Sequence, residues 1–331
     1  MENVLEIKNV CKQYDDFFLD HITFALPRGY IMGLIGPNGA GKTTIIKLIM
    51  RLIMKNEGTI NIFGLDNNEN EVEIKSRIGF VYDNPNYYEH LNLKQIKGII
   101  APFYKTWDGK IFKELIDKFQ LPMKKTMKKF SRGMIMKAAI AIALSHHADL
   151  IIMDEPTSGL DPIFRRELLD ILYDLIQNEN KSVLFSTHIT SDIERIADFI
   201  TFILNGKIIF SKAKDEVQEQ YALIKGDNKF INNEIKKQFE GVRQTEFGFE
   251  ALTAMVPSDH GVLGPAAHFL GVEARTVSAR AAVSASLKSR LRTEIFNTGG
   301  HGACKYRPRC QHGTLEQVLS GRVRGCQIPP Q

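Results

Sequence analysis

Two kinds of hydrophobic pattern alternate along the first 210 residues. Short apolar runs rich in β-branched residues predict buried strands at residues 3–9, 30–35, 78–82, 149–154, 182–187 and 199–204. Longer stretches carry apolar residues three and four positions apart, which predicts amphipathic helices at residues 42–54, 93–105, 134–146, 163–178 and 190–197. This alternation is typical of an α/β fold in which helices pack on a largely parallel sheet.

The pattern becomes irregular after this region. Residues 207–255 are a Lys-rich mixture with one predicted helix near 213–224 and Gly-containing loops. We therefore expect a main domain over residues 1–215 and an accessory segment over residues 216–255, appended to the core.

The segment at residues 36–43 reads GPNGAGKT and matches the pattern GxxxxGK[ST], directly after an apolar run and before a predicted helix. In such a loop, backbone N–H groups close around phosphate oxygens, and the following helix adds the positive end of its dipole. Lys42 would neutralise the β- and γ-phosphates of a nucleotide, and Thr43 would place its hydroxyl on Mg²⁺. A plain Gly-rich turn is the alternative, and the flanking strand and helix argue against it.

A second candidate site follows the apolar run 150–153, which ends in the carboxylates of Asp154 and Glu155. In a protein with a phosphate-binding loop, the first acid holds Mg²⁺ directly or through water, and the second polarises the attacking water as a general base. Two solvated loop acids are the alternative. The phosphate-binding loop upstream favours the catalytic interpretation.

With these two motifs in place, the chain resembles the ATP-binding subunit of an ABC transporter over about residues 1–215. Five further features match motifs of that family. They are the D-loop at residues 158–161, the switch histidine His188, the signature at residues 130–134, the adenine-stacking aromatic Tyr14 and the Q-loop at residues 82–83.

The resemblance implies a P-loop NTPase of the ABC cassette type, with a mostly parallel core sheet, an antiparallel β part and a helical signature subdomain at about residues 90–146. It also implies ATP and Mg²⁺ as cofactors. The implied catalytic residues are Glu155, His188 and Lys42, and the implied Mg²⁺ ligands are Thr43, Asp154 and Asp83. The implied nucleotide-binding residues are Tyr14, Gly36, Pro37, Asn38, Gly39, Ala40, Gly41, Lys42, Thr43, Thr44, Ser131, Gly133 and Asp161.

Cassettes of this family pair head to tail, with ATP between the phosphate-binding loop of one chain and the signature of the other. By this resemblance, Ser131 and the N–H groups from Gly133 onward would contact the γ-phosphate held by the partner chain. Glu155 and His188 would act on the water and the γ-phosphate in their own chain. Opening and closing of the pair would then drive transport.

Two positions depart from the family pattern. Asp83 stands where a Gln is expected, and a carboxylate there could still reach Mg²⁺ although its charge opposes the phosphates. In the signature, Arg132 and Met134 replace Gly and Gln. Arg132 either adds positive charge near the phosphates of the partner chain or is a solvated surface residue. Such variants resemble those of a subset of bacterial ABC-2-type exporters linked to antibiotic and multidrug efflux.

The segment at residues 83–90, DNPNYYEH, resembles the region where these cassettes receive a coupling helix from the membrane subunit. Paired tyrosines beside a proline suit a partner groove, because aromatic side chains anchor interfaces. A core-packed aromatic loop is the alternative.

Composition changes abruptly near residue 256. Residues 1–255 hold 33 basic and 34 acidic residues, a net charge of −1, whereas residues 256–331 hold 10 basic and 4 acidic residues, a net charge of +6. The overall charge of +5 therefore belongs to the tail, and no nucleic-acid partner is expected for the main domain. The tail is interpreted as foreign to the domain, through a frameshift, a fusion or a faulty gene model, although a TLE segment at residues 314–316 leaves a genuine ending possible.

The tail holds five residues of metal-ligating types, which are His301, Cys304, Cys310, His312 and Cys326. They raise the question of zinc, but their spacing fits no usual finger pattern. No stretch reaches about 18 uninterrupted apolar residues, and the acidic N-terminus lacks the features of a signal peptide. We therefore expect a cytoplasmic protein, bound peripherally at the inner face of the cell membrane.

The partners implied by the resemblance are a separate polytopic membrane permease subunit and a second cassette, as a homodimer or a heterodimer. The function that follows is ATP binding and hydrolysis that power a bacterial exporter through cassette dimerisation. The alternatives are a soluble ABC ATPase acting on the ribosome or nucleic acid, and an ATP-dependent dimerisation module without transport.

Overall fold

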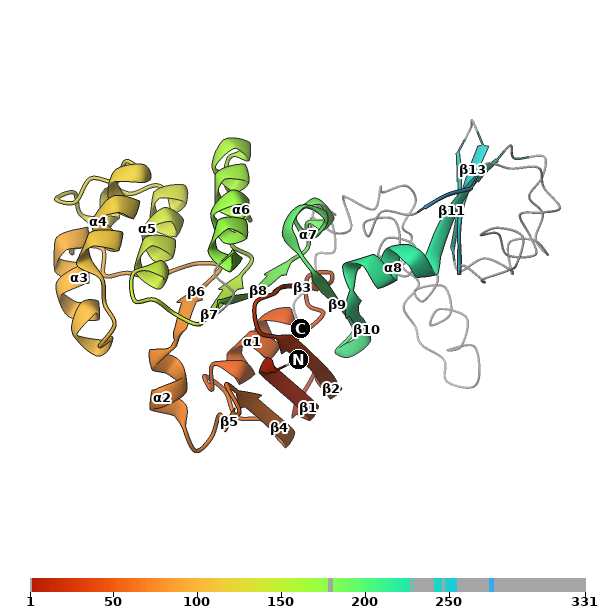
Figure 1. Cartoon of the computed structure of the whole chain (residues 1–331), viewed down its shortest axis with the longest axis horizontal. Coiled ribbons are helices and arrows are strands. Elements are labelled where there is room, and N and C mark those ends of the chain that lie inside the picture. The colour runs from red at the N-terminus through yellow and green to blue at the C-terminus, as the bar shows by residue number, and fades with distance from the viewer. Residues whose placement is uncertain are drawn as a thin grey trace, which may run out of the picture. The chain divides into compact units, whose positions relative to one another are not determined.

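The computed structural model describes residues 2–177, 181–226, 228, 241–245, 248–254 and 274–276 (Figure 1). Contacts within the chain divide it into two compact units. The first comprises Met1–Gly36 and Ala40–Asp215, and the second comprises Pro37–Gly39 and Glu216–Gln331. Among the described residues, no helix combines the length and hydrophobicity needed to cross a membrane.

A six-stranded sheet forms the centre of the first unit, in the order β10-β9-β3-β8-β7-β6. Its strands are β3 (Ile31–Ile35), β6 (Ile78–Val81), β7 (Leu150–Asp154), β8 (Ser182–Thr187), β9 (Phe199–Leu204) and β10 (Lys207–Ala213). All neighbours are parallel except β10, which runs antiparallel to β9. The register pairs Ile35 with Thr187 and Asp154 with Ser186, so the carboxyl ends of β3, β7 and β8 meet at one edge.

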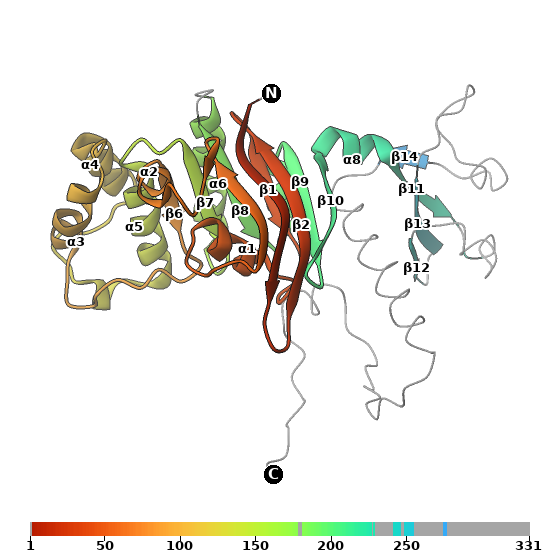
Figure 2. The ribbon, with the colours of Figure 1, turned by 90° about the horizontal axis from the view of Figure 1, so that it is seen from below.

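Helices flank this sheet and connect its strands. They are α1 (Lys42–Ile49), α2 (Glu71–Ser76), α3 (Leu93–Ile100), α4 (Gly109–Lys118), α5 (Arg132–Leu144), α6 (Pro162–Ile176) and α7 (Thr190–Ile196), with short 3₁₀ turns at Ala101–Phe103 and Met127–Lys129. Figures 1 and 2 both show α3, α4 and α5 gathered together on the side of β6. All five helices predicted in this unit are confirmed, although α1 ends at Ile49 rather than residue 54.

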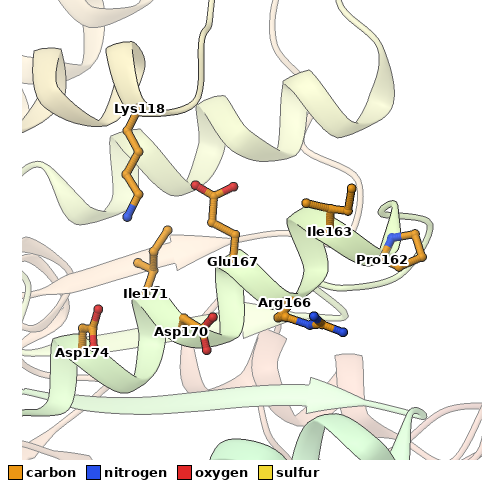
Figure 3. A pocket seen from close by; sticks show the side chains of 8 residues that line it. All are labelled: Lys118, Pro162, Ile163, Arg166, Glu167, Asp170, Ile171 and Asp174. Atoms are coloured by element: carbon orange, nitrogen blue, oxygen red, sulfur yellow. The ribbon is translucent and has the colours of Figure 1, made fainter.

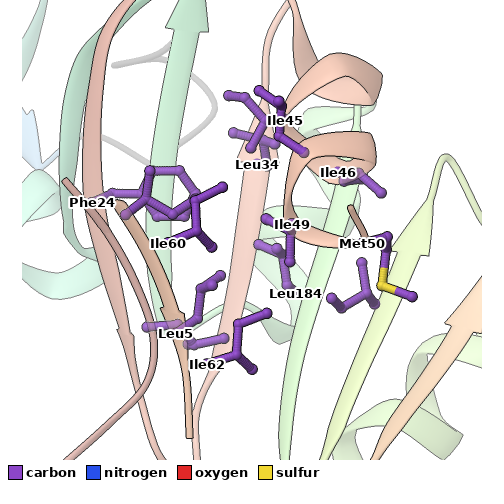
Figure 4. Packing of buried hydrophobic residues seen from close by; sticks show 14 of the residues in the cluster. Leu5, Phe24, Leu34, Ile45, Ile46, Ile49, Met50, Ile60, Ile62 and Leu184 are labelled. Atoms are coloured by element: carbon purple, nitrogen blue, oxygen red, sulfur yellow. The ribbon is translucent and has the colours of Figure 1, made fainter. Parts of the chain in front are cut away.

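A second, antiparallel sheet in the first unit has the order β2-β1-β4-β5. Its strands are β1 (Asn3–Gln13), β2 (Phe18–Pro27), β4 (Glu57–Ile62) and β5 (Leu65–Asp66). Figure 4 shows Leu5, Phe24 and Ile60 of this sheet directed toward Leu34 of β3 and Ile45 of α1, within one buried cluster. The shared core thus holds β3 and α1, the two elements that flank the phosphate-binding loop.

The second unit contains an antiparallel sheet in the order β12-β13-β11-β14. Its strands are β11 (Tyr221–Gly226), β12 (Gly241–Thr245), β13 (Gly248–Ala254) and β14 (Ala274–Thr276). The helix predicted near residues 213–224 is wrong at its end, because α8 covers Lys214–Gln220 and the apolar run after it pairs with β13 as a strand. The tail residues considered for zinc lie outside the described residues.

Candidate active site

The phosphate-binding loop leaves β3 and opens α1. Gly39 and Gly41 have φ angles of 79° and 112°, in the left-handed region that side chains rarely adopt. A Cβ at Gly41 would also lie 2.6 Å from Leu19 Cδ2, so glycine is required here for space as well. The carbonyl of Ala40 accepts a hydrogen bond of 3.1 Å from the N–H of Gly206. The glycines therefore keep the loop backbone accessible. Leu19 of β2 packs against the loop, and Gly206 of the turn between β9 and β10 binds its carbonyl.

Lys42 begins α1 and is almost completely buried, at 5% exposure. Its Nζ donates to the carbonyl of Gly36 at 2.9 Å and lies 3.1 Å from Oε1 of Glu155. The phosphate-binding loop and the Asp154–Glu155 pair are thus in direct contact, although Asp154 follows Lys42 by 112 residues in the sequence. No side chain caps the N-terminus of α1, which suits a site for an anion at this helix end.

Asp154 ends β7 and is buried, at 1% exposure. The Oγ of Ser186 donates to its Oδ1 at 2.6 Å, and the hydroxyl of Thr43 also donates to it. Burial, the largest effect, raises the pKa of Asp154, and the charges of Glu155 and Asp83 raise it further, despite the two hydroxyl donors. Such a carboxylate is unfavourable when ionised, and a divalent cation held by Thr43 and Asp154 would relieve that cost.

Glu155 follows immediately and has a φ of 48°, a strained value for a residue other than glycine. Its N–H donates to the Oγ of Ser186 at 3.0 Å, and its Oε2 lies 2.7 Å from Nδ1 of His188. Burial by itself, the largest effect, raises the pKa of Glu155. The hydrogen bond with His188 and the charge of Lys42 together outweigh it and bring the pKa below its ordinary value. The carboxylate is therefore ionised at neutral pH and able to accept a proton.

Asp83 follows β6, beside β7 in the sheet, and its side chain is exposed. Its charge acts on the carboxylate of Asp154, which places the two acids in the same neighbourhood. Tyr82 next to it has a pKa raised first by burial and then by the charge of Asp154. Asp83 therefore belongs to the acidic side of the site. Among the described residues, its interaction with Asp154 is one of charge and not a hydrogen bond.

Asp161, which is predicted from the D-loop to contact nucleotide, makes two hydrogen bonds to the backbone of its own chain. It is the N-cap of α6, where its Oδ1 accepts from the N–H groups of Ile163 at 3.1 Å and Phe164 at 2.9 Å. Earlier in the same loop, the Oγ1 of Thr157 donates to the buried carboxylate of Asp192 at 2.7 Å. The loop after Glu155 is thus fixed at both ends.

The signature opens α5. Ser131 is the N-cap, and its Oγ accepts from the N–H of Met134 at 3.3 Å. Ser131 and Arg132 are exposed. The Arg132 guanidinium lies against Gly159, since its Nη1 would be 3.3 Å from a Cβ built there. In this chain the departure from the family signature therefore brings a positive charge onto the D-loop.

Tyr14 follows β1 and is 41% exposed. Its N–H donates to the carbonyl of Phe17 at 2.8 Å, and the Nζ of Lys12 lies 5.2 Å from its ring centroid. Phe17 in turn approaches the phosphate-binding loop, with its Cζ 3.0 Å from the Cβ position of Gly41. The structure therefore brings the predicted adenine platform and the phosphate loop into one region.

Two supporting residues were not predicted. Ser186 bridges the buried carboxylate of Asp154 and the N–H of Glu155. A hydroxyl within the apolar strand β8, two residues before His188, is a signal that could have identified it. Gly206, which supports Ala40, has no such signal, because only the fold brings the β9–β10 turn to the loop.

A pocket lies along α6 (Figure 3). Its lining comes from α6 and from Lys118 of α4, and includes Ile163, Arg166 and Asp170. None of the predicted site residues lines it. We therefore assign the chemistry to the edge of the sheet and not to this pocket.

Comparisons with known proteins agree with this geometry. A family profile described as ABC transporter matches residues 19–158. The bacitracin transport ATP-binding protein of Bacillus licheniformis is 31% identical over 253 residues, which cover 76% of this chain and 81% of that protein. The lantibiotic transport ATP-binding protein of Streptococcus pyogenes is 35% identical over 215 residues, covering 64% of this chain and 92% of that protein.

Solved structures show the same fold. The structure of an ATP-binding subunit of an ABC transporter matches with a TM-score of 0.60 and 29% identity, covering 65% of this chain and 92% of that one. A dimeric ATP-binding cassette in a post-hydrolysis state, bound to ADP and Pi, matches with a TM-score of 0.57 and 23% identity, covering 63% of this chain and 98% of that one. This second likeness concerns the fold alone.

Proposed function

Because this chain belongs to the ATP-binding subunits of ABC transporters, ATPases coupled to transport, we propose that it powers the export of antibiotics or related drugs, with Glu155 as the general base. The observation that carries the catalytic assignment is the contact of Glu155 with both Lys42 and His188. The bacitracin and lantibiotic transport proteins among its relatives support the class of cargo.

ATP would bind with its phosphates against the loop at residues 36–44 and its adenine on Tyr14. Two features support this placement: the glycines that keep the loop backbone accessible and the uncapped N-terminus of α1. The exposed face of Tyr14 suits stacking on a base.

The residues present also fit Mg²⁺. Thr43 and Asp154 offer a hydroxyl and a buried carboxylate already in contact with each other, and Asp83 adds a third oxygen ligand nearby. When bound there, Mg²⁺ would supply positive charge against the charge that develops on the β- and γ-phosphates. Asp83 would be a weaker Mg²⁺ ligand than Asp154, because its side chain is exposed to solvent.

Phosphate binding would release the base. The Oε1 of Glu155 is held by Lys42 at 3.1 Å, and its Oε2 by His188 at 2.7 Å. When Lys42 turns to the phosphates of ATP, Oε1 becomes available to a water molecule while His188 keeps the carboxylate oriented. The water oxygen then bonds to the γ-phosphorus as its proton passes to Glu155, and the bond to the β–γ bridging oxygen breaks, leaving ADP.

A second cassette would complete the site, as a homodimer or a heterodimer. The exposure of Ser131 and Arg132 at the N-terminus of α5 supports a contact with the γ-phosphate held by the partner chain. ATP would then join two chains, and hydrolysis would separate them. This is a two-state switch governed by the γ-phosphate.

The mechanical output would go to a separate polytopic membrane subunit, with this chain at the inner face of the membrane. Residues 83–90 are our candidate for the contact, because they adjoin Asp83 of the site and because Tyr88 is 73% exposed. A movement of the cassettes at the acidic side of the site would thus be transmitted through residues 83–90 to the membrane subunit.

The test is capture of the partner. The Glu155→Gln variant, held with ATP, serves as bait in detergent-solubilised membranes and cytosol of the host, and mass spectrometry identifies what co-purifies. The same bait with ADP is the control. ATP-dependent recovery of a polytopic membrane protein is the expected result, whereas recovery of ribosomal or DNA-bound proteins contradicts the exporter assignment.

A further inference from the structure

Three metal-ligating side chains meet on the antiparallel sheet, in addition to the predicted Mg²⁺ ligands. Cys11 of β1, His21 of β2 and Glu57 of β4 each bring one ligand atom to a common place, where all three atoms lie within 4.8 Å of one another. They belong to three different strands, with Cys11 and His21 ten residues apart and Glu57 a further 36 residues along the chain. Nothing in the ATPase chemistry described above uses them.

The register of the strands explains the cluster. Cys11 and Glu57 are direct partners across β1 and β4, so their side chains share a face. The pairing of β1 with β2 shifts between Val10 and Lys12, which leaves His21 in an irregular position with a φ of 49°. There its N–H donates to the Sγ of Cys11 at 3.4 Å. The bulge therefore aligns the histidine with the cysteine.

The cluster is open to solvent on one side. Val10 and Ile22, the neighbours of Cys11 and His21, belong to the buried core cluster, whereas Cys11 and His21 do not. Cys11 is nevertheless only 3% exposed, whereas His21 and Glu57 are exposed. A buried thiol with two accessible partners forms a site that an ion can enter from solvent.

We propose that Cys11, His21 and Glu57 bind one Zn²⁺ ion. A thiolate, an imidazole and a carboxylate are the ligand types that Zn²⁺ accepts, and three protein ligands leave a fourth position for water. Ligand atoms around tetrahedral zinc lie roughly 3.3–3.8 Å apart, given bond lengths of about 2.0–2.3 Å. No separation therefore needs to close by more than about 1.5 Å, a distance that rotation of the exposed His21 and Glu57 side chains can supply.

A second carboxylate supports the histidine. The Nδ1 of His21 lies 2.6 Å from the Oδ1 of Asp20, and the Oδ2 of Asp20 lies 3.1 Å from the Nζ of Lys207. A metal on Nε2 leaves this hydrogen bond in place, which is the carboxylate–histidine arrangement that orients ligands in zinc sites. Asp20 is therefore a positioning residue of the proposed site.

Bound zinc would tie three strands together next to the phosphate loop. The N–H of Asp20 donates to the carbonyl of Gly206, whose own N–H supports Ala40. We expect the ion to stabilise the first unit without taking part in hydrolysis, so its loss should raise sensitivity to heat and leave the chemical step intact.

Cobalt(II) is the direct probe, because a thiolate-bound tetrahedral Co²⁺ gives a charge-transfer band and intense visible absorption. The full-length chain is used with Cys304, Cys310 and Cys326 changed to Ser, so that Cys11 is the remaining thiol. We expect one Co²⁺ per chain, displaced by Zn²⁺, with both spectral features. Absence of the thiolate band in this protein overturns the proposal.

Variants in the same background then locate the ion. Cys11→Ala should abolish the thiolate band, and His21→Ala or Glu57→Gln should weaken Zn²⁺ binding at least 100-fold. Asp20→Asn should weaken it about 10- to 100-fold, as outer partners of ligands do. His147→Ala removes an exposed histidine paired with Asp108 elsewhere and should change nothing. Unchanged Zn²⁺ affinity in the His21 and Glu57 variants, which alter only surface side chains, contradicts the assignment.

Discussion

Glu155 connects the separate motifs of this chain, because it contacts a residue from each of two others. Its two carboxylate oxygens are held by Lys42 from the phosphate loop and by His188 from the end of β8. Its backbone N–H is fixed by Ser186. A carboxylate held on three sides has little freedom to rotate, which would favour a defined position for the attacking water if Glu155 is the base, as proposed.

His188 is the support of Glu155 that can be removed most cleanly. Its loss removes the 2.7 Å hydrogen bond to Oε2 and one of the influences that lower the pKa of Glu155. We expect His188→Ala to reduce phosphate release about 100-fold while ATP affinity changes less than threefold. Nucleotide-binding fluorescence and phosphate release measure the two quantities, with the exposed His147→Ala as control. Turnover close to wild type in His188→Ala would remove His188 from the mechanism.

The residues proposed as catalytic could be selected from the sequence because their motifs are local. The loop at residues 36–43 and the pair Asp154–Glu155 each carry their own signal of spacing and strand context. The roles of Gly206 and Phe17 could not be predicted in this way. Each acts through a contact with a residue distant in sequence, which exists only once the chain has folded.

At the scale of elements, the parallel strands were predicted, whereas only β1 of the antiparallel sheet β2-β1-β4-β5 was located, as the strand at residues 3–9. Strands buried on both faces, such as β7 and β8, read as continuous apolar runs. By contrast, β4 mixes exposed and buried positions within six residues and gives no clear run. Helix α4 was also missed, because only Phe112 and Ile116 of its ten residues are buried. The hydrophobic pattern of a sequence reflects burial, so helices and strands with few buried residues give no clear pattern.

Helix α6 depends on its cap. The Asp161 carboxylate satisfies two backbone N–H groups at the start of the helix. We expect Asp161→Ala to lower the free energy of unfolding by about 1 kcal/mol, with Asp161→Ser restoring most of it. Urea denaturation measures both. If the alanine variant loses hydrolysis with no loss of stability, Asp161 acts in catalysis and not as a cap.

The end of α5 carries a pH-sensitive group. Burial, the largest effect, lowers the pKa of His146 to about 4, and its ring stacks on Tyr104 with centroids 3.9 Å apart. Unfolded His146 binds a proton near its ordinary pKa of 6.5, so between pH 6.5 and 4 the unfolded state holds more protons. Stability contributed by neutral His146 is therefore present above pH 6.5 and is lost as the pH falls toward 4.

We expect the wild type to lose about 2 kcal/mol more than His146→Phe between pH 7 and pH 4.5, allowing for partial solvent screening. The phenylalanine keeps a ring against Tyr104 and removes the titration. Urea denaturation at several pH values provides the comparison. Parallel pH profiles for the two proteins would show that His146 does not contribute.

At the scale of the whole molecule, the described first unit ends at Asp215 and the strong change in composition follows about forty residues later. Composition could show that two kinds of sequence meet near residue 256, but not how they fold. Charge averaged over 331 residues was misleading here, since the +5 total comes from the tail and the main domain is near neutral.

Assembly is expected to follow the nucleotide. In the proposed pairing, the exposed signature at Ser131 and the phosphate loop would be complementary halves of a shared site. We expect Glu155→Gln to sediment as a dimer with ATP and Mg²⁺ and as a monomer with ADP. A sedimentation coefficient that is the same in both nucleotides would contradict ATP-driven pairing.

The central claim is that this chain hydrolyses ATP with Glu155 as its base, and phosphate release by purified protein tests it most directly. Wild type is compared with Glu155→Gln and with Glu114→Gln, which removes an exposed carboxylate of α4. We predict that Glu155→Gln binds ATP and releases phosphate at least 100-fold more slowly, while Glu114→Gln matches wild type. Turnover by Glu155→Gln at the wild-type rate would contradict the account.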